Sequence, residues 1–392
     1  TDVNYFNFYI SAAGKFFIDW GDGTIETYNK TASDTLYSHS YPATGTYRVR
    51  ITGTVTAYHN YETTAAISFY NSVNKMYITA IEGSLGKIFS TLSNGTQPSF
   101  HRTFAGCEGI SSSIPEDLFQ GVIGQPKAYM FDQTFFGCNG LSGEIPAGLF
   151  SGLRGTPKNS LFSNTFVSCY NLTGSIPENL FAGISGSPAP YMFSGTFNSC
   201  SGLTGEIPAN LFAGISGAPA TNMFNNTFSG ATGLTGIGGA LFANISGAPM
   251  QNMFDKTFAG CSGLTGSIPN GLFGKFNGAP SQRMFSEVFQ NCSGLTGSIP
   301  SNLFAGITGA PANQMFYRTF SGCSGLSGEI PSTLFAGLSG APATYMFSGT
   351  FNNCNGLTGS IPSGLFAGMN GEPIIILFER TIFGDAGFTC DM

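Results

Sequence analysis

The sequence predicts a repeat solenoid of short parallel strands and short helices, preceded by a small all-β sandwich. The first observation is a sequence repeat of 31 residues that recurs from about residue 81 to the end of the chain. The second is a cysteine position that marks the period, and the third is strand-like alternation in the first fifty residues. One repeat of this size cannot bury its apolar side alone, so neighbouring repeats must complete the core.

The cysteine position fixes the register of the repeats. Its members lie 31 residues apart, except that the step from Ala231 to Cys261 is one residue shorter because a residue is lost between Gly236 and Ile237. The members are Cys107, Cys138, Cys169, Cys200, Ala231, Cys261, Cys292, Cys323, Cys354 and Asp385. Residues 81–392 are therefore predicted to form about ten turns. Residues 54–80 are a predicted transition that starts the solenoid and shields its first turn.

Composition narrows the classes of function. Only 9% of the 392 residues are charged and 42% are hydrophobic, which is the composition of a folded chain and not of a disordered one. The formal net charge of −6, with 15 lysines and arginines, offers no basic surface for a phosphate backbone, so we expect no nucleic-acid partner. No apolar stretch approaches about 18 residues, so we expect no membrane insertion.

The N-terminal segment, residues 1–53, alternates apolar and polar residues between turn signals, which predicts short antiparallel strands. Asp22 and Gly23 are typical of a hairpin turn, and Trp20 is the expected core anchor. The stretch FIDWGDG (residues 17–23), followed by HSY (39–41) and GTYRV (45–49), resembles the polycystic-kidney-disease-type (PKD) domain. That resemblance implies an immunoglobulin-like sandwich.

Within a repeat, two periods predict two elements. Phe131, Phe135 and Cys138 are spaced i, i+4 and i+7, which predicts one inward stripe of a short helix. In the stretch LSGEI (residues 141–145), leucine, glycine and isoleucine alternate with serine and glutamate. This alternation predicts a short strand with the first set inward and the second set outward.

The repeats also resemble known families. The stretch GLTGSIPSNLFAG (residues 294–306) resembles leucine-rich repeats, and the combination TFxGCxGLTxxIP resembles the BspA-type repeats of bacterial surface proteins. The resemblance covers three quarters of the chain, although these repeats are longer than BspA-type units, with the surplus in the AGISGAP loop. It implies a leucine-rich-repeat-like solenoid that acts in adhesion or interaction, secreted or on a bacterial cell surface.

The cysteines predict a buried, reduced row and no metal site. Stacked identical positions direct their Cβ atoms in parallel, which is poor geometry for a disulfide, and a straight row cannot surround a tetrahedral ion. Occasional pairing of neighbouring thiols is the alternative. Cys390 lies outside the row and is the thiol that we expect to be exposed. The repeated phenylalanines are predicted core. We therefore expect no cofactor.

The outward strand positions form the predicted surface, which we name the strand face. Its first row is Ser142, Thr173, Thr204, Thr235, Thr265, Thr296, Ser327 and Thr358. Its second row is Ser113, Glu144, Ser175, Glu206, Ser267, Ser298, Glu329 and Ser360. The candidate partner-binding residues are Ser142, Glu144, Thr204, Glu206, Ser327 and Glu329, together with the variable Tyr129, Tyr191 and Tyr345.

The strand face allows three interpretations. Small residues fit a crowded parallel sheet and need no ligand; a flat polar face suits a protein or glycan ligand, or another copy of the chain. A third alternative is ice binding, because Thr-x-Ser arrays occur in some antifreeze solenoids, but the interspersed glutamates count against it. The tyrosines are either surface contacts or caps of the predicted helix stripe.

Nothing in the spacing of the polar residues predicts an enzyme. The three histidines, His39, His59 and His101, all precede the regular repeats, and no Ser/His/Asp or Cys/His arrangement is signalled. Asp19 and Asp22 are too few for a calcium site. We expect a rigid interaction scaffold. The alternative is a structural subunit that assembles into filaments or a surface layer, suggested by the apolar run of residues 374–378 near an end that lacks a clear polar cap.

Overall fold

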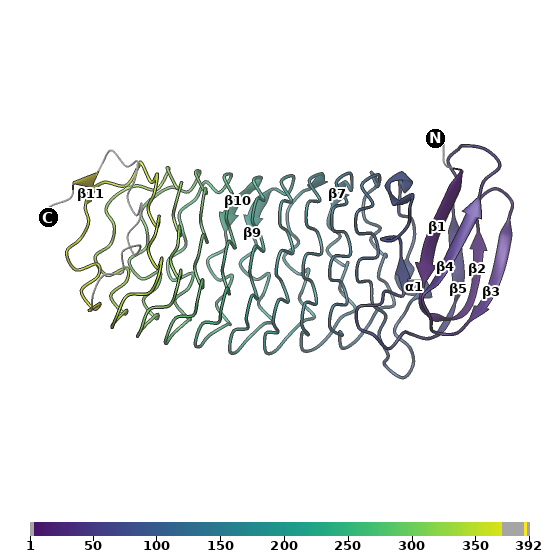
Figure 1. Cartoon of the computed structure of the whole chain (residues 1–392), viewed down its shortest axis with the longest axis horizontal. Helices are drawn as coiled ribbons and strands as arrows, with labels where there is room; N and C mark the ends of the chain where they lie inside the picture. Colours follow the sequence, from purple (N-terminus) through teal and green to yellow (C-terminus); the bar gives the residue numbers. More distant parts are fainter. Residues whose placement is uncertain (1–3, 371–387, 390–392) are drawn as a thin grey trace.

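The computed structural model describes residues 4–370 and 388–389. It is a long β-rich body with the N-terminal strands at one end, and the repeats follow as coils that lie side by side (Figure 1). The sheets are small and open. Among the described residues, helical structure is limited to the 3-10 turn η1 (Lys75–Tyr77) and to α1 (Leu85–Ile88). Both precede the first cysteine of the repeats.

The N-terminal strands form two antiparallel sheets of three strands, ordered β4-β1-β6 and β3-β2-β5. Their bounds are β1 (Tyr5–Ile10), β2 (Ala13–Asp19), β3 (Ile25–Lys30), β4 (Thr35–Ser40), β5 (Arg50–Ala57) and β6 (Ile67–Ser68). Aromatic side chains join the two sheets: the rings of Phe8 and Trp20 are 5.7 Å apart, and those of Tyr28 and Tyr37 are 4.6 Å apart. Trp20 is fully buried, which confirms it as a core residue.

The N-terminal sheets continue past the predicted boundary at residue 53 and cover the first coil. β5 runs to residue 57, and β6, inside the predicted transition, pairs with β1. The Ile67 carbonyl of β6 accepts a hydrogen bond from the Thr103 hydroxyl at 2.9 Å, and Phe16 stacks on Phe89 with 6.0 Å between ring centroids. One apolar core therefore runs from the sheets into the coils.

The prediction of a short helix in each repeat is wrong. Residues 129–138 and their equivalents form a ladder of turns, which we name the turn ladder. The N–H groups of Phe131 and Phe135 donate to Leu161 and Thr165 of the next coil at 3.0 and 2.9 Å. The intervening N–H of Thr134 donates back to Phe131 in its own coil, at 3.2 Å. Backbone hydrogen bonds thus alternate between the next coil and the same coil.

A left-handed residue at every fourth position produces this alternation. In one coil these residues are Tyr129, Gln133 and Gly137, with φ of 57°, 57° and 71°. Each one reverses the local path of the chain, so that the pairs Met130-Phe131 and Thr134-Phe135 both enter the core. Apolar residues that recur at every fourth position are also close to the helical period of about 3.6 residues, which is why the sequence pattern indicates a helix.

Two rows of phenylalanine, one of threonine and one of cysteine stack in the core of the coils. Phe131 lies 5.8 Å from Phe162, and Phe135 lies 5.5 Å from Phe166, with nearly parallel rings. A threonine row, fully buried, contains Thr103, Thr134, Thr165, Thr196, Thr227, Thr257, Thr319 and Thr350, with Val288 in the same position of one coil. The fourth row is that of the cysteines.

The threonine and cysteine rows cross-link adjacent coils through side-chain hydrogen bonds. The Thr165 hydroxyl donates to the Phe131 carbonyl of the preceding coil at 3.0 Å, and the Cys169 thiol donates to Phe135 at 3.1 Å. The eight cysteines from Cys107 to Cys354 are all buried, as predicted. Cys390 and Asp385 lie outside the described residues.

Short parallel strands join the coils along a second line. They are β7 (Gly143–Glu144) with β8 (Leu172–Thr173), β9 (Gly205–Ile207) with β10 (Leu234–Ile237), and β11 (Gly359–Ser360) with β12 (Phe388–Thr389). Leu141 and Ile145 are buried as predicted, but Gly143 is only half-buried. Its φ of 74° interrupts simple alternation, so the predicted inward position of this glycine is wrong.

A third line of parallel bridges lies where the sequence suggested only a loop. Gly155 bridges Ile184, and Gly186 bridges Ile215, with equivalent bridges in the other coils. The N–H of Gly155 donates to Gly183 at 3.0 Å, and the N–H of Ser185 donates to Gly155 at 2.9 Å. The turn ladder, the strands and these bridges therefore attach each coil to the next at three places.

The residue lost after Gly236 is absorbed by a shift of register. In β10, Leu234 pairs with Gly205, but Gly236 pairs with Glu206 and Ile237 with Ile207. The shift keeps Ile237 in the core, at 7% exposure. The cost falls on the surface, because this coil presents Thr235 without a serine or glutamate beside it.

The threonine row predicts that the loss of a single hydroxyl group lowers the stability of the protein. Thr196→Val removes a buried hydroxyl that donates to Phe162 of the preceding coil at 3.0 Å. We expect the free energy of unfolding to fall by about 1 kcal/mol, the net value of one such hydrogen bond. Urea denaturation monitored by far-ultraviolet circular dichroism measures this change in stability.

The reverse substitution, Val288→Thr, is the matched control for this measurement. It restores the hydroxyl at the one described coil whose core holds valine at that position. We expect no loss of stability. An unchanged Thr196→Val protein, or an equal loss from both substitutions, contradicts a hydrogen-bonding role of the threonine row.

The cysteine row predicts thiols that react only after unfolding. Burial raises the pKa of Cys107, Cys200, Cys261 and Cys323 to about 12, so their reactive thiolate form is scarce near neutral pH. Alkylation of the native protein, mapped by mass spectrometry, should leave the eight buried cysteines unmodified, and urea should release all of them. Rapid labelling of any of the eight in the native protein contradicts the packing described.

Candidate binding surface

The two outward rows of the strand face lie on the surface as predicted. Every member of the second row is exposed, and so is every member of the first row except Ser142, which is half-buried. Leucine and isoleucine on either side of the rows are buried, so the face rests on the core of the coils. Because successive coils pair in parallel, equivalent side chains recur at about 4.8 Å.

The side chains of the three glutamates lie flat against the strand face and do not point away from it. A Cβ atom added to the glycine of the following coil would meet the Glu Cγ at 2.7 to 3.2 Å. The pairs are Glu144 with Gly174, Glu206 with Gly236, and Glu329 with Gly359. Each glutamate side chain therefore covers bare backbone of the next coil, and glycine in that coil leaves it room.

Hydroxyl groups of the first row also bond between coils. The Ser142 hydroxyl donates to the Ser111 carbonyl at 2.7 Å, and the Thr296 hydroxyl donates to Thr265 at 3.0 Å. These bonds support the structural interpretation of the row. They also orient the oxygen atoms, because a hydroxyl that donates inward still has lone pairs to accept a hydrogen bond from a ligand.

The central part of the array carries very little charge. Between Asn159 and Phe254 the only charged residues are Glu178 and Glu206. Glu206 lies on the strand face, and Glu178 follows Pro177 beyond its edge. A ligand on this part of the face would therefore meet hydroxyl oxygens and a single carboxylate, with no positive charge nearby in sequence.

The structure does not bring all the predicted site residues together. Ser142 with Glu144, Thr204 with Glu206, and Ser327 with Glu329 lie on the strand face, each pair in its own coil. Tyr129, Tyr191 and Tyr345 lie on the turn ladder, at its first left-handed position, with φ of 57°, 58° and 55°. Tyr191 is 46% exposed and the other two are half-buried. The helix stripe that they were predicted to cap is absent.

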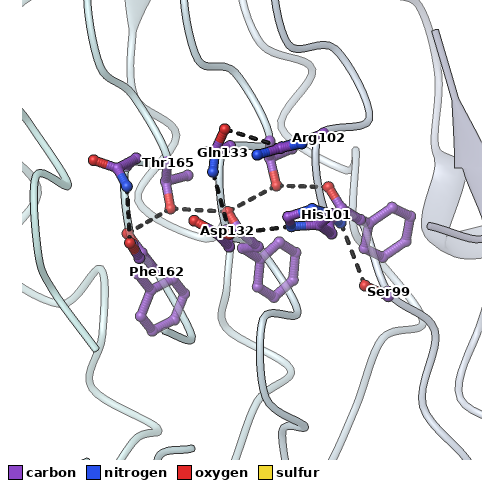
Figure 2. Close-up of polar contacts among 12 residues, drawn as sticks. Ser99, His101, Arg102, Asp132, Gln133, Phe162 and Thr165 are labelled. Carbon is purple, nitrogen blue, oxygen red and sulfur yellow. Dashed lines mark hydrogen bonds and ion pairs between the residues drawn. The ribbon is translucent and has the colours of Figure 1, made fainter. Parts of the chain in front are cut away.

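A partly buried polar cluster at the first coils was not predicted. Figure 2 shows His101 beside Asp132 of the next coil, with Nδ1 to Oδ2 at 3.1 Å, and Arg102 Nε donating to Gln133 Oε1 at 3.0 Å. The Ser99 hydroxyl accepts from the backbone N–H of His101 and not from its imidazole. These groups join two coils. They do not form a serine-histidine-aspartate relay.

A second cluster lies on the turn ladder about five coils further along. Arg283 lies between Asp255, with Nε to Oδ2 at 3.3 Å, and Glu287, at 3.8 Å, while Lys256 is 3.7 Å from Glu287. Burial raises the pKa of Asp255 and Glu287 in spite of these cations. The signal in the sequence was charged residues at positions where most other repeats have uncharged residues.

The described residues contain neither a metal-binding cluster nor a membrane-spanning helix. No group of three or more histidine, cysteine, aspartate or glutamate side chains in residues 4–370 has the arrangement of a metal site. The described helices are all too short to cross a bilayer. Asp22, one of the two turn aspartates, is paired with His39 at 2.7 Å, and this hydrogen bond, which His39 donates, lowers the pKa of Asp22 to about 2.

The chain was also compared with known proteins. No protein-family model and no curated protein matches it. The resemblances to PKD domains and to BspA-type repeats therefore rest on the sequence motifs quoted above.

The glycines of the strand face predict a contrast between two nearly identical substitutions. Gly174→Ala places an L-residue at φ 73° and its Cβ at 2.7 Å from Glu144. The left-handed conformation alone should cost about 1 to 2 kcal/mol. Gly266, at the same position three coils away, has no left-handed φ and open space around its added Cβ.

Gly266→Ala is thus a matched control, which we expect to leave the urea midpoint nearly unchanged while Gly174→Ala lowers it. Equal effects of the two substitutions would show that the backbone of the strand face does not differ between these coils as described.

Proposed function

We propose that this chain is a non-catalytic interaction protein, secreted or displayed on a bacterial surface. In this proposal the coils are a leucine-rich-repeat-like solenoid of about ten turns, and the strand face binds a protein or glycan ligand. The PKD-like N-terminal sandwich caps the first turn and protects its core from water.

The exposure and rigidity of the strand face carry the proposal. Its side chains stand outside a continuous core, and each coil is attached to the next by hydrogen bonds at three places. A ligand binding to such a face orders few flexible groups, so little conformational entropy opposes binding. The face is also polar, with hydroxyl oxygens and three carboxylates, which suits hydrogen-bonding partners.

Solenoid architecture is the interpretation that best accounts for the coil contacts. Bridges recur between residues 28 or 29 apart, and each coil meets only the coils before and after it along these lines. The sandwich completes this interpretation, because a repeat array needs a cap at each end. The adhesion role itself comes from the family resemblance and from the nature of the face.

The test is binding of the purified chain to immobilised collagen, fibronectin and laminin and to a glycan array. The variant Glu144→Gln/Glu206→Gln/Glu329→Gln keeps the shape of the face and removes its charge. For any ligand bound by the native chain, we expect the triple variant to weaken affinity tenfold or more, because each glutamate lies on the face itself.

Glu178→Gln is the matched control, since Glu178 is exposed but lies beyond the two rows. It should bind like the native chain. The proposal fails if no ligand in the panel binds above background, or if the triple variant and the control bind equally well to the ligand that does.

A further inference from the structure

An apolar patch is exposed where the N-terminal sheets meet the first coil. Val73, Met76 and Tyr77 are 68%, 56% and 65% exposed, and they lie within five residues of one another. Phe136, on the turn ladder two coils on, is also exposed. We name these residues, with Tyr70, Lys75 and Arg102, the junction patch. Most other exposed large apolar residues of the described chain occur singly, which is ordinary for a protein surface.

The junction patch is held in place by several contacts. Lys75 Nζ donates to the Tyr70 carbonyl at 2.8 Å, and the N–H of Tyr77 donates to Asn74 at 3.0 Å. The Met76 carbonyl presses on the first coil, since a Cβ added to Gly109 would lie 2.0 Å from it. A fixed apolar surface of this kind can bind a partner without first becoming ordered.

Two cations give the patch its charge. Lys75 and Arg102 both lie over the ring of Tyr70, at 4.6 and 5.2 Å from its centroid. Among the described residues, neither forms an ion pair with a carboxylate within 4.0 Å. The complementary partner is therefore a segment of bulky apolar residues flanked by carboxylates.

The chain contains one segment with these properties. Residues 372–379 read EPIIILFE, an apolar run with a glutamate at each end. In the preceding repeat, the positions of Ile374, Ile375 and Ile376 hold Ala343, Thr344 and Tyr345, and no other repeat has three large aliphatic residues there. Three isoleucines therefore exceed what the repeat itself requires at these positions.

We propose that the junction patch of one molecule binds residues 372–379 of a second copy, joining molecules head to tail. The isoleucines cover the exposed Val73, Met76 and Tyr77, and the flanking glutamates approach Lys75 and Arg102. Burial of apolar area drives the contact, and the opposite charges orient it.

The same molecule cannot supply this segment to its own patch. Residues 70–77 precede α1 and residue 370 follows β11, and these two elements lie at opposite ends of the coils (Figure 1). At about 4.8 Å for each coil-to-coil step, the separation is about 40 Å. Residue 370 and β12, which pairs with β11, both lie with the far coils, and the residues between them, fully extended outward and back, would reach only about 30 Å. A contact between copies that does not close on itself propagates as an open chain.

The test uses two variants, each of which lacks one of the two surfaces needed for head-to-tail association. Val73→Ser/Met76→Ser/Tyr77→Ser changes the patch only at exposed positions, and Ile374→Ser/Ile375→Ser/Ile376→Ser changes the segment. Sedimentation equilibrium should show a native mass that rises with concentration. Each variant alone should associate at least tenfold more weakly. An equal mixture should form a dimer, because it still contains one intact patch and one intact segment.

Ile25→Ser is the matched control, because Ile25 is 66% exposed on β3 and away from the patch. It should associate like the native chain, and circular dichroism should confirm that all variants are folded. A native chain that stays monomeric at every concentration overturns the proposal. So does a folded patch variant that associates as the native chain does, or a mixture that gives no dimer.

Discussion

The structure depends on one constraint: backbone groups inside a narrow coil must find partners in the neighbouring coils. In the turn ladder, alternate N–H groups such as those of Phe131 and Phe135 donate to the next coil, and the others close turns within their own. Buried backbone groups left without partners are costly, so a coil at the end of the array is stable only under a cover. β6 provides that cover. Its Ile67 carbonyl accepts a hydrogen bond from the Thr103 hydroxyl, just as the Phe131 carbonyl accepts one from the Thr165 hydroxyl in a later coil.

This constraint also shapes the surface. Because the core rows fix each coil on its neighbours, the strand face repeats at the coil spacing, and its glutamates lie over glycines of the next coil. Where one residue is missing after Gly236, the register shifts so that Ile237 stays buried, and the loss appears on the strand face beside Glu206. The core packing thus stays regular from coil to coil, while the surface does not. Any binding specificity must therefore come from residues outside the core that vary between coils.

Sequence patterns predicted the buried residues better than the backbone that carries them. The core positions of Phe131, Phe135 and Cys138 followed from their spacing, but their helix did not form, because a left-handed residue every four positions gives the same apolar period. The signal was present in coils where asparagine and glycine take those positions, as in Asn222, Asn226 and Gly230, since these residues tolerate positive φ best. The outward rows followed from alternation. The ionic clusters did not, because pairs such as His101 and Asp132 lie 31 residues apart and become neighbours only through stacking.

Hydrogen exchange followed by mass spectrometry tests the central claim most directly, namely that backbone hydrogen bonds between coils hold the array together. In the central coils, peptides that cover residues 191–199 and 222–230 should exchange as slowly as β5 and β2 of the N-terminal sheets, because almost every amide there has a bonded carbonyl partner. Far-ultraviolet circular dichroism of the same sample should lack a helical spectrum. Rapid exchange in these peptides, or a clear helical contribution, would contradict the account.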